Sequence, residues 1–306
     1  MRPFFLFLLL SFVLVSLNNA HAYTFQTLDY PGASCTCLYG INNSGQIAGT
    51  YYDSSGGHGF LYDPANGFQT LDYFVGNRIY FYGINDSGQI VGTYYNSGYH
   101  GLFYDPANGF QTLDYPGGSS TRYNDINNSG QMVGSVQIPY VGERGLFYDP
   151  ANGFQILHYY SRNFRFTGIN DSGQIVGVTY FNSSYHGLLY DSANGFQIFD
   201  YPGAGTFGTI LEAINNRGQI VGYGFLYDPT NGFQPLNHPG GYYTRYYDIN
   251  DRGQIVGTYY DPSGSGSWHG LLIDPDTPNN PVPEPATVML LAAGLGLLSF
   301  SRRKKH

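Results

Sequence analysis

The sequence predicts an all-β fold, a six-bladed β-propeller assembled from four-stranded repeats of about 42 residues. Three observations support this prediction. A phrase of the form Ile-Asn-x-x-Gly-Gln-x-x-Gly recurs along the chain, its spacing is close to the length of one propeller blade, and the two ends of the repeated region complete each other. The six copies of the phrase begin at Ile41, Ile84, Ile126, Ile169, Ile214 and Ile249.

Each repeat contains four short runs of β-branched and aromatic residues that are separated by turn signals. The composition, with Tyr 31 and Phe 22 against Trp 1, is typical of strands. Asn/Asp-x-Gly and Asp-Pro-Ala-Asn-Gly segments supply tight reversals of the chain. The strand that ends in Ile-Asn is expected nearest the central channel, and the strand that begins with Phe-Gln is expected outermost.

The ends of the repeated region predict how the ring closes. The last unit, residues 248–275, has only three strands, whereas an unmatched fourth-strand phrase occurs before the first unit. Residues 25–30 are therefore expected to complete the last blade, which removes the exposed edges of an open array. An open β-solenoid is the alternative architecture, and its terminal repeats would be atypical caps. The fourth-strand phrase begins at Phe25, Phe68, Phe110, Phe154, Phe196 and Phe233.

The first 22 residues are predicted to be a secretory signal peptide. Arg2 gives a positive start, a mostly apolar run covers residues 4–17, and Ala20 and Ala22 form a small-x-small cleavage site. An uncleaved membrane anchor is the alternative interpretation. The predicted organisation is a signal peptide at 1–22, a propeller at 23–275, a linker at 276–281 and a sorting signal at 282–306.

The C-terminal segment has three parts in order. Residues 286–300 are apolar and would form a helix of about 22 Å, short for a hydrocarbon core of about 30 Å. The basic residues at 302–305 would hold the end of this transmembrane helix on the cytoplasmic side during a transient insertion into the inner membrane. The motif ahead of the helix is Val282, Pro283, Glu284 and Pro285.

These three parts resemble a PEP-CTERM sorting signal. The resemblance implies an exosortase substrate that is cut near residues 283–285 and delivered to the cell envelope, the outer surface or the outside. The family is associated with exopolysaccharide and biofilm production. A plain C-terminal membrane anchor is the alternative.

The charge of residues 23–281 excludes one class of partner. This region holds eight arginines, no lysine and 20 acidic residues, a formal charge of −12. Nucleic-acid binding depends on neutralising phosphates with Lys and Arg, so neither DNA nor RNA is expected as a partner.

The phrases INDSGQIVG and HGFLYDPANGF resemble the HAF-repeat family of extracellular proteins, over about residues 23–275. The resemblance implies an extracellular β-repeat architecture and adds no reaction. Glycine follows the repeat histidine where the family name has alanine, and two units carry Arg144 and Tyr223 in place of histidine. The four repeat histidines are His58, His100, His186 and His269.

The residues that could carry chemistry favour structural roles. The repeat histidines are expected to form a hydrogen bond with a neighbouring turn. The segments that begin at Asp125 and Asp248 resemble the first half of a calcium-binding loop, but their residues fit hairpin turns better. Two glutamates, Glu143 and Glu212, are expected in irregular connections, and no Ser-His-Asp grouping is apparent in the sequence. We therefore predict no catalytic residues, no metal and no cofactor.

The two cysteines, Cys35 and Cys37, are predicted to have a local structural role. A disulfide between cysteines two residues apart would be strained. A redox or metal-binding role is the alternative.

The predicted function is that of a non-enzymatic binding or structural module in an exopolysaccharide matrix, with a matrix glycan as the partner. Binding sites on such scaffolds usually lie on variable loops. Trp268, Tyr185 and Tyr99 are the predicted stacking residues. A polysaccharide-cleaving extracellular enzyme on a propeller scaffold is the alternative. The variable hairpins, expected to project from one side, are 53–57, 96–99, 139–143, 182–185 and 262–268.

Overall fold

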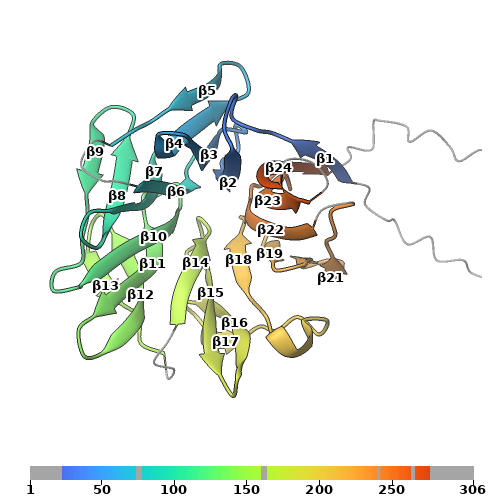
Figure 1. Ribbon diagram of the computed structural model, residues 1–306. Helices are drawn as coiled ribbons and strands as arrows, with labels where there is room; N and C mark the ends of the chain where they lie inside the picture. The colour runs from blue at the N-terminus through green and yellow to red at the C-terminus, as the bar shows by residue number, and fades with distance from the viewer. Residues whose placement is uncertain (1–22, 74–77, 160–163, 240–241, 263–265, 276–306) are drawn as a thin grey trace, which may run out of the picture. The chain divides into compact units, whose positions relative to one another are not determined.

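The predicted six-bladed propeller is confirmed by the computed structural model, which describes residues 23–73, 78–159, 164–239, 242–262 and 266–275. These residues form 24 strands and one short 3-10 turn, η1 (Gly205–Phe207). The strands make six four-stranded sheets arranged around a centre (Figure 1). Residues 24–274 form one compact unit.

Each blade is an antiparallel sheet whose strands follow one another in chain order. Blade 1 has β2 (Cys35–Ile41), β3 (Ile47–Asp53), β4 (Gly56–Asp63) and β5 (Gly67–Thr70). Blade 2 has β6 (Arg78–Ile84), β7 (Ile90–Tyr95), β8 (Tyr99–Asp105) and β9 (Gly109–Thr112). Blade 3 has β10 (Ser120–Ile126), β11 (Met132–Ile138), β12 (Gly142–Asp149) and β13 (Gly153–Ile156). Blade 4 has β14 (Phe164–Ile169), β15 (Ile175–Phe181), β16 (Ser184–Asp191) and β17 (Gly195–Ile198).

Blade 5 has β18 (Leu211–Ile214), β19 (Ile220–Gly222), β20 (Phe225–Asp228) and β21 (Gly232–Pro235). Blade 6 combines β22 (Tyr242–Ile249), β23 (Ile255–Asp261) and β24 (Ser267–Pro275) with β1 (Tyr23–Thr27), in the order β1-β24-β23-β22. The Leu28 N–H continues this pairing by donating to the Gly270 carbonyl (2.9 Å). The predicted closure by the N-terminal strand is therefore correct.

The first strand of each blade lies nearest the centre, as predicted. Strand β2 contacts β6 on one side and β22 on the other, and the same relation holds around the ring. Hydrophobic clusters between successive blades form the core. Phe81 of β6, which is fully buried, packs with Ala48 of blade 1 and Leu102 of blade 2. Fully burying such a side chain contributes about 1.5–3 kcal/mol.

The repeated Asn of the Ile-Asn phrase joins neighbouring blades. Asn42 Oδ1 accepts the backbone N–H groups of Ser44 (3.1 Å) and Gln46 (2.9 Å), which closes the predicted turn. Its Nδ2 donates to the carbonyl of Asn85 in the next blade (3.0 Å). The same bond recurs between every pair of blades, and Asn250 closes the ring on Asn42 (3.0 Å). This turn residue is therefore also an inter-blade connector.

The next residue of the phrase forms a second ring in which asparagine and aspartate alternate. The Asn128 amide donates to the carboxylates of Asp86 and Asp171 on its two sides (2.9 Å each). The backbone N–H of each member donates to the side chain that follows it in the ring. The alternation supplies each carboxylate with amide donors and keeps like charges apart. The members are Asn43, Asp86, Asn128, Asp171, Asn216 and Asp251.

The terminal segments predicted to be a signal peptide and a sorting signal lie outside the described residues. Among the described residues, no helix is both long enough and apolar enough to cross a membrane. The predicted transmembrane helix at 286–300, the linker and the cleavage sites at Ala20–Ala22 and Val282–Pro285 all belong to the undescribed segments.

Candidate functional site

The repeat histidines each bind an aspartate that follows the outermost strand of their blade. The Nδ1···Oδ2 distances are 3.0 Å for His58–Asp72, 2.7 Å for His100–Asp114, 2.8 Å for His186–Asp200 and 2.6 Å for His269–Asp29. In three blades the second carboxylate oxygen accepts the N–H of the glycine after the histidine. Each pair thus connects the third strand to the segment beyond the fourth, in line with the expected bond to a neighbouring segment.

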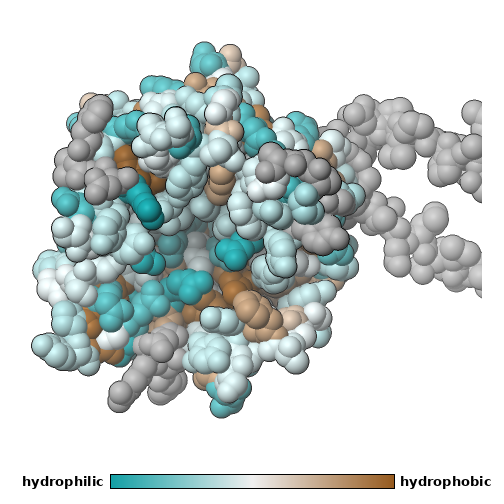
Figure 2. All heavy atoms as spheres, viewed as in Figure 1, coloured by the Kyte–Doolittle hydropathy of each residue, from teal (hydrophilic) through white to brown (hydrophobic). Residues whose placement is uncertain are grey.

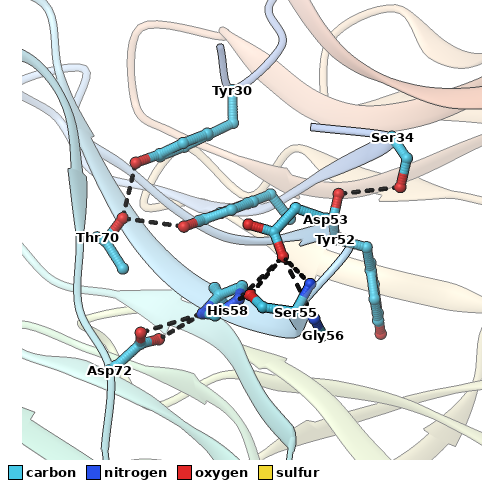
Figure 3. Close-up of polar contacts among 10 residues, drawn as sticks. Tyr30, Ser34, Tyr52, Asp53, Ser55, Gly56, His58, Thr70 and Asp72 are labelled. Carbon is cyan, nitrogen blue, oxygen red and sulfur yellow. Dashed lines mark hydrogen bonds and ion pairs between the residues drawn. The ribbon is translucent and has the colours of Figure 1, made fainter. Parts of the chain in front are cut away.

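Two of these pairs also contact a serine. In blade 1, Ser55 Oγ lies 2.8 Å from His58 Nε2, opposite the Asp72 contact (Figure 3). In blade 6, Ser267 Oγ lies 3.0 Å from His269 Nε2. Both arrangements have the connectivity of a Ser-His-Asp triad. These groupings were not apparent in the sequence, because they depend on which residues the fold brings together.

The surroundings of Ser55 favour a structural role for the grouping in blade 1. Ser55 Oγ also lies 2.6 Å from Asp53 Oδ1, a second carboxylate that competes for its proton. The pKa of His58 is raised despite its burial, because Asp72 and Asp53 stabilise the imidazolium, which is the wrong form for a general base. In blade 2, Nε2 of His100 lies 3.1 Å from the carbonyl oxygen of Asn96, where the histidines of blades 1 and 6 contact a serine. The histidine–aspartate pair is therefore a property of the repeat.

A cavity of about 360 Å³ lies on the axis of the ring. It is lined by one equivalent residue from the first strand of every blade, two positions before the Ile of the repeated phrase. Arg122 and Arg165, two residues earlier on β10 and β14, also line it, with Ser135 and Glu143. The six equivalent residues are Tyr39, Tyr82, Asn124, Thr167, Glu212 and Tyr247.

A groove of about 690 Å³ shares two lining residues, Glu143 and Arg165, with this cavity and therefore lies next to it. Aromatic side chains line the groove, and Tyr180 and Phe207 are 47% and 54% exposed. Tyr185 packs between them, with its ring 5.0 Å from Tyr180 and 5.3 Å from Phe207. Figure 2 shows a face that is hollowed near the centre of the ring, with hydrophilic residues beside the hollow.

The predicted stacking residues fall at different places. Tyr185 lines the groove, as part of a hairpin that was expected to vary. Tyr99 stacks beneath Arg122, with the guanidinium carbon 4.0 Å from the ring centre, and so contacts a cavity residue. Trp268 packs on Tyr260 of blade 6 (5.5 Å) and lines neither space. Ligand binding by these three residues stays a prediction.

Two glutamates were wrongly placed by the sequence argument. Glu143 lies on β12 and Glu212 on β18, rather than in irregular connections. Glu212 is the acidic member of the axial layer, and burial raises its pKa to about 7 against the opposing effect of Arg165 and Arg245. The signal that could have found Glu212 is departure from the repeat, because the six equivalent positions hold four kinds of residue (Tyr, Asn, Thr and Glu) on an otherwise uniform strand.

The cysteines are both free, with their sulfur atoms 3.9 Å apart on β2. Hydrogen bonding between them raises the pKa of Cys35 and lowers that of Cys37 to about 7. No group of three or more His, Cys, Asp or Glu residues suited to a metal ion occurs within the part of the chain that the structure describes.

Asp125 and Asp248 each bridge two neighbouring blades. Asp125 accepts the N–H groups of Ile126 and Ile169, both at 2.8 Å. Asp248 accepts those of Ile249 (2.8 Å) and Ile41 (2.7 Å). Burial raises the pKa of both carboxyl groups, to about 7 for Asp248. Both carboxyl groups therefore accept hydrogen bonds from a neighbouring blade. This structural role replaces the calcium-loop alternative.

This arrangement predicts a pH-dependent stability. In the unfolded chain the Asp248 carboxyl group has its ordinary pKa of 3.8, whereas in the folded protein its pKa is about 7. Between about pH 4 and pH 7 the folded state therefore binds a proton that the unfolded state has lost. The free energy of unfolding should fall as the pH rises through this interval. Asp248→Ala, which copies Ala213 of blade 5, should flatten the slope in a plot of Tm against pH. Equal slopes for the two proteins would contradict the assignment.

Comparison with known proteins identifies one segment and the fold. Residues 281–305 match the PEP-CTERM protein-sorting motif. The chain is thus an exported, envelope-targeted six-bladed propeller, and the motif supports processing by an exosortase. No curated protein matches the sequence.

Solved propeller structures are similar in fold. A streptogramin B lyase structure has a TM-score of 0.51 at 8% identity and covers 83% of this chain and 98% of its own. A gluconolactonase from Xanthomonas campestris has a TM-score of 0.53 at 10% identity, with 82% and 89% covered. A luciferin-regenerating enzyme has a TM-score of 0.51 at 7% identity, with 83% and 95% covered. At these identities the likeness shows the fold alone.

Proposed function

We propose that this exported propeller is a non-enzymatic binding module that holds a matrix polysaccharide in the groove and the axial cavity. The observation that supports this function best is an aromatic-lined groove that lies next to a polar cavity. Exposed aromatic rings stack on sugar rings, and a polar cavity supplies hydrogen bonds to hydroxyl groups. The sorting motif supports delivery of the protein to the envelope, where such polysaccharides are assembled.

The test is binding of purified exopolysaccharide from the host to the full chain. We expect saturable binding without release of shorter products. Tyr185→Ala should weaken binding by about tenfold, since an aromatic stacking contact contributes about 1 kcal/mol or more. Tyr243→Ala is the matched control, because Tyr243 is 71% exposed and lines neither space. Equal losses in the two variants would argue against the groove.

The second candidate function is hydrolysis, and the two Ser-His-Asp groupings support it. This chemistry transfers acyl groups, so it fits removal of an ester from a polysaccharide rather than cleavage of the glycosidic chain. A fluorophosphonate probe labels a serine only when its histidine activates it. We expect neither Ser55 nor Ser267 to be labelled. Labelling of Ser55 that is lost in His58→Asn, or labelling of Ser267 that is lost in His269→Asn, would favour the hydrolase hypothesis over the binding module.

A further inference from the structure

The geometry points to a more specific property: the axial cavity takes the carboxylate of a uronic acid residue, and Arg122 and Arg165 are its cationic ligands. This inference rests on the proposed function, because it names the class of polysaccharide that the module would hold.

The first argument is the distribution of charge. The region 23–281 is strongly acidic and has only eight arginines, yet three of them occupy one equivalent position on the first strands of blades 3, 4 and 6. These are Arg122, Arg165 and Arg245. Because equivalent positions of first strands converge on the axis, two of these arginines, Arg122 and Arg165, bring positive charge to the cavity, whose lining also holds Glu143 and Glu212.

The second argument is that Arg122 and Arg165 form no ion pair and donate no side-chain hydrogen bond to any other described residue. All ion pairs between described residues involve histidine, so none of the three arginines has a carboxylate within 4.0 Å there. Across the same residues, neither Arg122 nor Arg165 donates a side-chain hydrogen bond to the protein. Tyr99 stacks on the face of the Arg122 guanidinium and leaves the edge N–H groups available. Such an edge binds a carboxylate through two parallel hydrogen bonds.

The remaining lining favours a sugar over a peptide carboxylate. Asn124, Ser135 and Thr167 supply amide and hydroxyl groups, and three tyrosines supply phenols and ring faces. Aliphatic side chains, which would receive the side chains of a peptide, are absent from this lining. The volume of about 360 Å³ lies within the range of small-ligand sites, ~300–1,000 Å³. The groove then provides room for the rest of a polymer chain.

Glu212 makes the site sensitive to pH. It is faced by Arg165 from β14 and by Arg245 and Tyr247 from β22, and Glu143 of β12 is the second carboxyl group in the lining of the cavity. With a pKa of about 7, Glu212 is largely neutral at pH 6 and ionised at pH 8, where its charge would repel a uronate and offset the charge of Arg165. The affinity for the acidic ligand should therefore fall as pH rises from about 6 to 8, and Glu212→Gln should remove this dependence.

The experiment titrates the full chain with trigalacturonate and with its carboxyl-reduced, neutral analogue. We expect tighter binding of the acidic trimer, and Arg122→Gln and Arg165→Gln should each weaken it by about tenfold or more while leaving the neutral trimer unaffected. Arg217→Gln is the matched control, because Arg217 lies in an Asn turn and lines neither space. The arginine variants are assayed only where their denaturation midpoints equal that of the native chain.

Several outcomes would overturn the inference. Equal affinity for the two trimers, with Tyr185→Ala still harmful, would reject the carboxylate site and leave the proposed function intact. Failure to bind either trimer or the host polysaccharide would reject both. Inorganic phosphate or the free carboxylate of a tripeptide, if either competes as well as trigalacturonate, would show a site that does not select uronic acids.

Discussion

Replacing Gly92 with alanine is expected to destabilise the propeller by about 3 kcal/mol or more. Gly92 lies on β7 opposite Phe81, next to the register shift between Phe81 and Gly83. A Cβ at this position would overlap the carbonyl oxygen of Tyr80, which belongs to the backbone and cannot rotate away. The loss should appear as a lower denaturation midpoint.

The control is Gly109→Ala in the same blade. Gly109 has a φ of 77°, yet a Cβ there would meet nothing within 4 Å. The Gly109→Ala change should lower the free energy of unfolding by only about 1 kcal/mol, because alanine is strained in this left-handed backbone conformation. A Gly92 variant no less stable than the Gly109 variant would show that the close approach of β7 to β6 is not a constraint. The equivalent glycines, with the same expected sensitivity, are Gly49, Gly134, Gly177, Gly222 and Gly257.

Removing residues 23–29 from the exported chain is expected to abolish the monomeric fold. Blade 6 would lose β1, and β24 would become an exposed edge with unpaired N–H and C=O groups. His269 and the Gly270 N–H would also lose Asp29, which they contact at 2.6 and 2.9 Å. Size-exclusion chromatography and circular dichroism should show unfolding or association.

A synthetic peptide of residues 23–30 should restore the folded monomer by adding itself to the edge of β24, as peptides do in β-strand addition. A scrambled peptide of the same composition is the control. A truncated chain that stays monomeric with an unchanged denaturation midpoint would mean that the closure contributes little to stability.

The fold could be predicted from sequence because its signals are local and repeated. The Ile-Asn-x-x-Gly phrase marks a turn by itself, since Asn42 bonds the N–H groups of residues two and four positions later. Closure could be predicted because a fourth-strand phrase starting at Phe25 has no unit of its own. What could not be predicted is the bond from each Asn to the next blade, which depends on how blades pack.

Of the predicted stacking residues, Tyr185 lines the groove and Tyr99 contacts Arg122, and both were chosen because hairpins vary in an otherwise constant repeat. Ligand binding by either residue stays a prediction. Glu212, Arg122 and Arg165 were missed, because their convergence depends on which face of the first strand points to the axis. Residues about 42 positions apart in sequence meet there, and no local pattern reports this.

The histidine–aspartate pairs did carry a sequence signal. The unit with Arg144 in place of histidine has His158 in place of aspartate, and the unit with Tyr223 has Asn237. The two residues are thus lost together in both units that depart from the pattern. Comparing the repeats with one another would have predicted the contact.

The alternating ring of Asn43, Asp86, Asn128, Asp171, Asn216 and Asp251 has a consequence for how such a chain can change in length. Two kinds of residue can alternate around a closed ring only when the number of members is even. Insertion or loss of a single blade would set two carboxylates, or two amides, side by side without a complementary partner. A duplication or deletion that preserves this ring must therefore copy or remove two adjacent blades together. The unit of duplication is then about 85 residues, twice the length of one blade.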